Sequence, residues 1–354
     1  MDETTFVSIG FYVQSLSSIN EIHMQYTLDV YFRQSWNDPR LKFNDTDKPI
    51  NTGPNYANKL WLPDPYFMNS KEETFHTVTL PNVLLRIFPN GDVFYSQRLS
   101  LVVACNMKLE NFPMDKQVCD LKTMSFGYNT KDITLKWLTE GALSVNEDIE
   151  LPEFSLMRTE KGDCTQEYVT GTYSCLVAKF HITRRIEYYL VQTYLPTILI
   201  VVLSWVNFWI DPRATPARVS LGLLCVLTMT TQSTGVQAKL PRVSYIKSMD
   251  IWLNVCLIFV FGALLEYALV NVQSRKQDNN SKKKYQTENG DAVSKHTSHS
   301  YTVTVDIGEV PKETCCSKLW LSADRVDLVS RIAFPAAFAV FNLAYWIGYN
   351  HRPL

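Results

Sequence analysis

The chain carries two kinds of hydrophobic pattern. In its first half, apolar and polar residues alternate over short runs, and the clearest run lies between Ile22 and Trp36. One face of that run is apolar and holds Ile22, Met24, Tyr26, Leu28, Val30 and Phe32. A period of two residues predicts half-buried strands. The second half instead contains continuous apolar runs, which cover Tyr188–Ile210, Ala217–Leu240, Asp250–Val272 and Val326–Tyr349. Each has the roughly 20 residues that a helix needs to cross a bilayer.

These patterns predict an α+β membrane protein, in which an extracellular β-sandwich is followed by a four-helix transmembrane bundle. Strands are expected in the opening segment "TTFVSIGFYVQSL" and in a hairpin that turns at Pro89-Asn90-Gly91. More short strands follow between Lys131 and Lys179. The expected divisions are 1–186 for the sandwich, 187–272 for three spans, 273–322 for a largely disordered cytoplasmic loop, and 323–354 for the fourth span and an extracellular C-terminus.

Charge sets the expected orientation. The basic segment "SRKQDNNSKKK" follows the third span and favours the cytoplasm, so the sandwich is expected outside a plasma membrane, after loss of a secretion signal. A net charge of -1 gives no reason to expect a nucleic-acid partner. The polar stretch Gln277–Thr314 reads as mostly disordered, with a helical part just before the fourth span.

Eight cysteines and six histidines limit the chemistry. The outer half holds an even number of cysteines, as suits an oxidising compartment. Cys315 and Cys316 are expected to be reduced cytoplasmic thiols, with palmitoylation as the alternative. Asn44 begins a glycosylation sequon that is expected to be extracellular. The histidines show no ligand spacing and no nucleophile–base pair stands out, so we expect no metal, no cofactor and no enzyme.

The second apolar run has a polar stripe that a lipid-facing helix would not need. On a 3.6-residue helix one stripe is polar at both ends and leucine in the middle. It holds Pro216, Ser220, Leu224, Leu227, Thr231 and Thr234. One helix cannot enclose water, so the stripe predicts a ring of subunits around a pore. A ring of Leu227 would close that pore by dewetting.

Arg218 lies near the cytoplasmic end of the same run. Repeated around a ring, its guanidinium would form a positive collar that attracts anions, and no carboxylate lies between Asp211 and Asp250 to reverse the sign. The alternative is an arginine that snorkels at a helix end. The collar interpretation predicts a chloride pore.

The segment "CNMKLENFPMDKQVC" resembles the signature loop of the Cys-loop receptors, the pentameric ligand-gated ion channels. "LWLPDPYF", "FPNGDVFYSQR", "PARVSLG", "VLTMTTQS" and "LPRVSYIK" resemble the inhibitory branch of that family, in the family's order. The resemblance implies a pentamer, a chloride pore lined by the second span, and disulfides Cys105–Cys119 and Cys164–Cys175. "PAR" at Pro216–Arg218 is similar to the anion-selective branch, because the cation-selective branch carries a glutamate just before Arg218.

The resemblance places an agonist site between subunits, and the residue types suit a small amino acid. Arg33 can bind a carboxylate as a bidentate fork, with a hydrogen bond from Ser96, while aromatic rings hold the ammonium. The candidate residues are Tyr31, Arg33, Tyr66, Phe67, Phe94, Ser96, Ser125, Phe126, Tyr168, Thr170 and Tyr173. Two departures keep glycine, glutamate and another ligand open: Met124 replaces a glutamate of glycine receptors, and Gln14 replaces an arginine of glutamate-gated channels.

Gating is expected to pass through the Cys105–Cys119 loop. Phe112 and Pro113 would reach the link between the second and third spans, at Lys239 and Pro241, and Asp115 would pair with Arg184 or Arg185. The alternative is that these charges are unpaired at a wet interface. Leu224 replaces the threonine of most inhibitory receptors and should lengthen the dry constriction.

The expected function is a neurotransmitter-gated chloride channel opened by a small amino acid. Its expected partners are the agonist, chloride, membrane lipid and either identical or related subunits. Three rivals stay open: a channel for a different ligand, an agonist-blind accessory subunit, and a cation channel.

Overall fold

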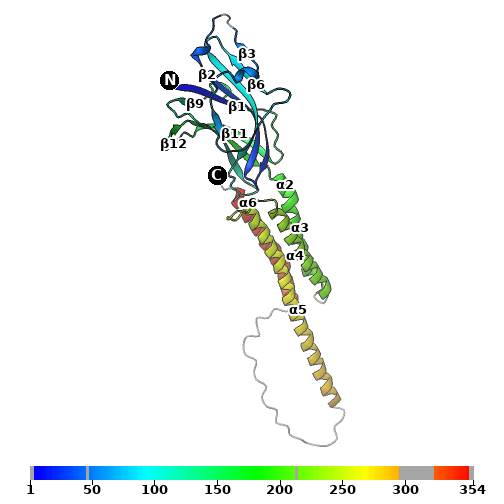
Figure 1. The fold of residues 1–354 in the computed structure, drawn as a ribbon. Coiled ribbons are helices and arrows are strands. Elements are labelled where there is room, and N and C mark those ends of the chain that lie inside the picture. The colour runs from blue at the N-terminus through cyan, green and yellow to red at the C-terminus, as the bar shows by residue number, and fades with distance from the viewer. Residues whose placement is uncertain (1–3, 45–47, 212–213, 295–322, 351–354) are drawn as a thin grey trace. The chain divides into compact units, whose positions relative to one another are not determined.

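A computed structural model describes residues 4–44, 48–211, 214–294 and 323–350 (Figure 1). The chain forms two compact units. The first, here called the sandwich unit, runs to Tyr188 and includes Lys239–Lys247. The second, the helical unit, contains Tyr189–Ala238 and the described residues that follow Lys247.

The sandwich unit is built from strands in two main sheets and one small hairpin sheet. The larger sheet has the order β10-β1-β2-β7-β6-β3, with β5 paired to β7 and β9 paired to β1. The smaller sheet has the order β11-β14-β8-β4, and β12 pairs with β13. The strands are β1 (Thr5–Asn20), β2 (Gln25–Asn37), β3 (Ile50–Thr52), β4 (Pro65–Phe67), β5 (Ser70–Phe75), β6 (Val83–Ile87), β7 (Asp92–Ala104), β8 (Lys116–Ser125), β9 (Ile133–Trp137), β10 (Leu143–Val145), β11 (Phe154–Asp163), β12 (Gln166–Tyr168), β13 (Gly171–Tyr173) and β14 (Cys175–Arg184).

Strand β2 shows how the alternating pattern becomes structure. Its side chains are buried at every second position from Tyr26 to Trp36, as the period of two requires. Strands β6 and β7 form the expected hairpin, and Gly91 occupies its turn with φ +88°. A side chain at Gly91 would also lie 2.7 Å from the Asp38 carbonyl oxygen, so both the backbone angle and the space favour glycine.

Aromatic side chains join the two main sheets. Phe67 of β4 packs against Phe32 of β2 with ring centroids 5.3 Å apart. Tyr26 of β2 meets Phe180 of β14 at 6.3 Å, and its hydroxyl donates to the Asp120 carbonyl oxygen. An apolar layer packed between two sheets is the core of a β-sandwich. The expected β-sandwich is therefore confirmed.

Among the described residues of the helical unit and the two residues before it, four segments are long and apolar enough to cross a membrane: Glu187–Trp209, Thr215–Gln237, Ser248–Lys276 and Arg325–Tyr349. The elements of this unit are the π-helical turn η2 (Leu190–Tyr194), α3 (Leu195–Trp205), the 3₁₀ turn η3 (Val206–Trp209), α4 (Thr215–Gln237), α5 (Ser248–Ser294) and α6 (Ala323–Asn350). Short helices elsewhere are η1 (Pro39–Leu41), α1 (Pro54–Ala57) and α2 (Glu187–Tyr189).

Helix α5 is longer than expected. It continues to Ser294, into the segment expected to be largely disordered (Figure 1). The extra turns include three consecutive lysines, which favour helices, and the stretch contains no proline. The remainder of the expected loop, with Cys315 and Cys316, lies outside the described residues.

Candidate functional site

The outer face of β2 and β7 carries an open depression of about 630 Å³. It brings together four residues predicted from the sequence, namely Tyr31, Arg33, Phe94 and Ser96. Arg33 lies directly opposite Ser96 in the strand register, and directly opposite residues on an antiparallel pair present their side chains on the same face. A guanidinium and a hydroxyl therefore border the same space.

Arg33 is held in place but keeps its charge available. Its guanidinium carbon lies 5.4 Å from the centre of the Tyr12 ring, which is a cation–π contact. Among the described residues, no carboxylate lies within ion-pair distance of it. A half-buried guanidinium without a carboxylate partner is suited to receive one from a ligand.

Sequence reasoning missed one wall of the depression. The β5–β6 loop, from Val78 to Asn82, lines it together with the first two residues of β6. A hydrogen bond from the Asn82 N–H to the His76 carbonyl oxygen (2.9 Å) closes this loop. Val78 and Leu80 are exposed, so the wall is apolar. The loop has no alternating pattern, and only the pairing of β5 and β6 with β7 brings it to the site.

A second group of predicted residues forms an aromatic cluster: Tyr66, Phe126, Tyr168 and Tyr173. The Tyr66 and Phe126 rings meet edge to face at 5.4 Å, and the Tyr168 and Tyr173 rings are 5.8 Å apart. Burial, together with the nearby Tyr168, raises the pKa of Tyr66 above its ordinary value, so Tyr66 stays a neutral phenol. Faces of such rings attract an ammonium.

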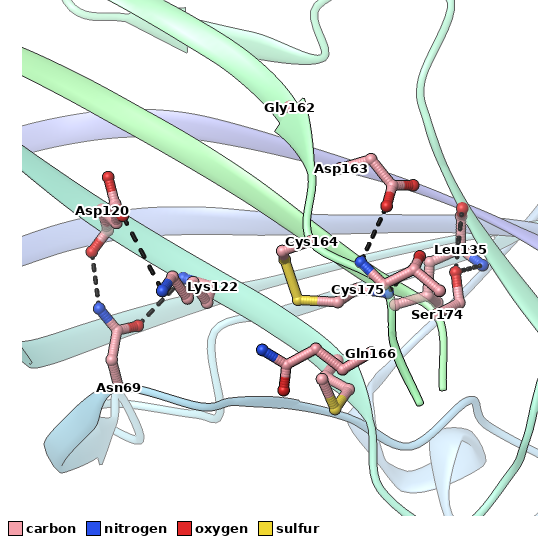
Figure 2. The surroundings of a disulfide bond; sticks show 12 residues. Asn69, Asp120, Lys122, Leu135, Gly162, Asp163, Cys164, Gln166, Ser174 and Cys175 are labelled. Carbon is pink, nitrogen blue, oxygen red and sulfur yellow. Dashed lines mark hydrogen bonds and ion pairs between the residues drawn. A yellow bond between two sulfur atoms is a disulfide. The ribbon is translucent and has the colours of Figure 1, made fainter. Parts of the chain in front are cut away.

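The β12–β13 hairpin that carries two of these tyrosines is closed at its base by the Cys164–Cys175 disulfide (Figure 2). The carboxylate of Asp163 accepts a hydrogen bond from the Thr165 N–H at 2.8 Å. Ser174 ties the hairpin to β9, because its hydroxyl oxygen accepts from the Leu135 N–H at 3.0 Å. At the tip, the Tyr173 hydroxyl donates to the hydroxyl of the predicted residue Thr170 at 3.1 Å.

Two predicted ligand contacts are corrected by the structure. Phe67 is 6% exposed and packs in the core between the sheets, because it alternates with Tyr66 on β4. Ser125 is 1% exposed, and its hydroxyl donates to Asp64 at 2.8 Å. The other oxygen of Asp64 accepts from the Gly127 N–H at 2.6 Å. The Ser125 hydroxyl and the Gly127 N–H thus both anchor the loop to Asp64. Phe126 lies between them and is 74% exposed.

The Cys105–Cys119 loop is closed by its disulfide and rests on a buried ion pair. Asp115 pairs with Arg184 rather than Arg185: Nε donates to Oδ1 at 2.8 Å. The Arg184 side chain is fully buried, and its Nη1 also contacts Glu21 at 2.5 Å. Gln117 donates to the second Asp115 oxygen at 2.6 Å. The alternative of unpaired charges at a wet interface is therefore wrong for this pair.

The loop meets the segment after α4 through a residue that the sequence did not suggest. The Leu109 N–H donates to the Tyr245 hydroxyl at 2.9 Å. Phe112 instead is 1% exposed, with its ring 4.7 Å from the Arg184 guanidinium. Pro113 is buried too, while the Lys239 ammonium donates to the Tyr188 hydroxyl at 3.4 Å. Pro241 is half-buried.

Helix α4 has two faces. The buried face holds Arg218, Gly222, Cys225 and Met229. Gly222 allows close packing, since a side-chain carbon there would lie 2.7 Å from Leu264 of α5. The predicted stripe is exposed throughout, and it consists of Pro216, Ser220, Leu224, Leu227, Thr231 and Thr234. The Thr231 and Thr234 hydroxyls donate to carbonyl oxygens one turn back, at 2.8 and 2.9 Å.

The prediction that Arg218 forms a positive collar on the stripe is wrong. Its side chain is fully buried and pairs with Asp327 of α6, with Nη2 2.9 Å from Oδ2 and Nη1 3.3 Å from Oδ1. Its Nε donates to the Ile210 carbonyl oxygen at 2.9 Å. Two residues advance about 200° around a helix, so Arg218 faces away from Pro216. It neither snorkels nor lines the stripe.

Two family models match this chain. The neurotransmitter-gated ion-channel ligand binding domain matches residues 1–186, and the neurotransmitter-gated ion-channel transmembrane region matches residues 193–294. A glutamate-gated chloride channel of Drosophila melanogaster is 39% identical over 393 aligned positions, which cover 99% of this chain and 86% of that protein. An extracellular ligand-binding domain followed by four membrane helices is therefore the architecture of this chain, which belongs to the neurotransmitter-gated ion channels.

Proposed function

We propose that this chain is a subunit of a plasma-membrane chloride channel opened by a small amino acid. The observation that carries the proposal is the cross-strand pair of Arg33 and Ser96 at the open depression. The guanidinium would bind the α-carboxylate as a fork, and the Ser96 hydroxyl would donate a further hydrogen bond. The Drosophila relative, named as a glutamate-gated channel, favours glutamate over glycine as the first agonist to test.

The site needs more than one copy of the chain. The depression is lined by none of the aromatic cluster, so each subunit offers two half-sites of opposite chemistry. An amino acid carries a carboxylate and an ammonium together, and each half-site suits one of them. A ring in which the depression of one subunit faces the aromatic cluster of the next satisfies both. The family resemblance makes that ring a pentamer, of identical or related subunits.

The exposed stripe of α4 would line the pore of that ring. Since Arg218 is paired with Asp327, its charge is largely neutralised at the stripe. The positive field for an anion would come instead from the N-terminus of α4, where no side chain caps the free N–H groups. No carboxylate lies on the stripe to oppose chloride. Leu224 and Leu227 would form the dry constriction.

Voltage clamp of cells expressing the chain alone tests the proposal. We expect current during application of glutamate or glycine, with a reversal potential that follows chloride when the external salt is exchanged. Arg33→Ala should raise the half-maximal agonist concentration about tenfold to a hundredfold, since a charge-assisted hydrogen bond contributes about 1.5–3 kcal/mol. Arg86→Ala is the matched control, because the Arg86 guanidinium is on the same sheet but donates to Asn51.

The outcomes separate the rivals. No current from the lone chain, with current restored by a related subunit, would identify an accessory role. Currents that follow sodium would reject the chloride assignment. If the Arg33→Ala variant reached the surface normally and responded to agonist as the wild type does, the agonist carboxylate would not bind Arg33 in the depression.

A further inference from the structure

The cytoplasmic end of the helical unit holds a buried group of charges that the proposed function leaves unused. Arg218 of α4 and Asp327 of α6 are 0% and 3% exposed. The guanidinium donates through both terminal nitrogens to Asp327, and through Nε to the backbone of Ile210. One positive charge is thus matched by one carboxylate.

A second buried carboxylate, that of Glu266, lies beside this pair. Glu266 of α5 is 7% exposed, and neither of its carboxylate oxygens has a hydrogen-bond partner among the described residues. It is close enough to interact electrostatically with both Asp327 and Arg218. The adjacent Tyr267, 4% exposed, also has a buried hydroxyl without a partner, and its ring lies 5.8 Å from the Arg218 guanidinium.

The charges that face Glu266 do not balance. Arg218 comes from α4, Asp327 and the Ser330 hydroxyl come from α6, and Tyr267 comes from α5 itself. Arg331, the next cation along α6, is engaged elsewhere, because its Nε donates to the Phe208 carbonyl oxygen at 3.0 Å. Two ionised carboxylates beside one guanidinium leave one uncompensated negative charge, which is costly to bury.

We propose that Glu266 is a proton-binding site on the cytoplasmic side of the helical unit, and that its proton is shared with Asp327. The carboxylate of Glu266 takes one proton from solution, and the new O–H donates to a carboxylate oxygen of Asp327. The net charge of the group then rises from minus one to zero. No other reactant is needed.

The proton would act on α4 through Arg218. Each oxygen of Asp327 accepts from Arg218, so a hydrogen bond from Glu266 to one of these oxygens would reduce its negative charge and weaken the contact with Arg218. Arg218 lies on the buried face of the helix whose opposite face carries the exposed stripe. Cytoplasmic pH should therefore bias the position of α4 and the opening of the channel.

Inside-out patches with agonist in the pipette test this inference. The bath is stepped from about pH 5 to about pH 9, a range in which buried carboxyl groups titrate, whereas ordinary carboxyl groups titrate below it. We expect open probability at a half-maximal agonist concentration to change about fivefold, the lower end of typical couplings. Glu266→Gln, which mimics the neutral acid, should be insensitive to bath pH. Asp211→Asn, an exposed carboxylate at the same end, should respond as the wild type does.

Infrared titration of the purified protein gives a readout that needs neither agonist nor current, so it stands even where the proposed function fails. The carbonyl-stretch band of a protonated acid should appear as pH falls and be smaller in Glu266→Gln. A pH response unchanged in Glu266→Gln would overturn the proposal. If that variant does not fold, a wild-type spectrum without a protonated-acid band in this pH range would overturn it equally.

Discussion

The Arg218–Asp327 pair allows a prediction that distinguishes a structural arginine from a pore arginine. Removing one partner of a buried ion pair costs about 3–5 kcal/mol, because it leaves the other charge uncompensated. Arg218→Met removes the guanidinium that pairs with Asp327 and leaves Asp327 and Glu266 facing each other. We expect the full cost for this variant, and poor surface expression.

Asp327→Leu should be milder, although it breaks the same pair. Glu266 lies within electrostatic range of the guanidinium and can replace the lost carboxylate. We therefore expect about half the cost, roughly 1.5–2.5 kcal/mol, because one carboxylate still compensates the buried cation. The variant Asp327→Leu combined with Glu266→Gln removes the replacement as well, and should be as unstable as Arg218→Met.

Heating followed by fluorescence-detected size exclusion ranks the stability of the three variants in detergent. Reversal potentials are then measured for every variant that reaches the surface. Asp327→Leu channels should keep the wild-type chloride reversal potential, since the stripe is unchanged. If Arg218→Met channels were as stable as wild type but passed sodium, the guanidinium would act on ions in the pore and the reasoning would be refuted.

Two more predictions concern gating. Leu224→Thr should shorten the dry constriction, because Leu224 is 56% exposed on the stripe one turn from Leu227; single-channel recording without agonist should show more openings, and unchanged resting closure would contradict the role. Asp115→Asn should weaken the buried contact with Arg184 while preserving its shape. Maximal agonist current per surface receptor should fall, whereas Lys116→Gln, an exposed neighbour, should leave it unchanged; equal losses in both variants would argue against a specific ion-pair effect.

Local sequence patterns were sufficient to predict which face of a single strand or helix a side chain occupies. The alternation along β2 predicted that Arg33 faces outward, since the period of a strand is fixed by backbone geometry. The same rule excludes Phe67 from a site that contains its neighbour Tyr66, although both aromatics look equally suitable in the sequence. The loop at Val78 could not be placed without knowing which strands pair.

Arg218 shows where the sequence was insufficient. Its position on the helix places it opposite the stripe, but its partner Asp327 is 109 residues away, near the start of another helix. A lone arginine at the end of an apolar run gives the same local pattern whether it lines a pore, snorkels or pairs. Only the packing of α4 against α5 and α6 decides among these.

The hydrogen bonds between Asp64 and the loop that carries Phe126 affect how strongly this aromatic ring can bind a ligand. Phe126 stands exposed, yet the residues on both sides of it are hydrogen-bonded to one carboxylate. A ring displayed on a restrained backbone has little conformational entropy left to lose when a neighbouring chain or a ligand covers it. Loosening that anchor would weaken binding without removing a single ligand contact.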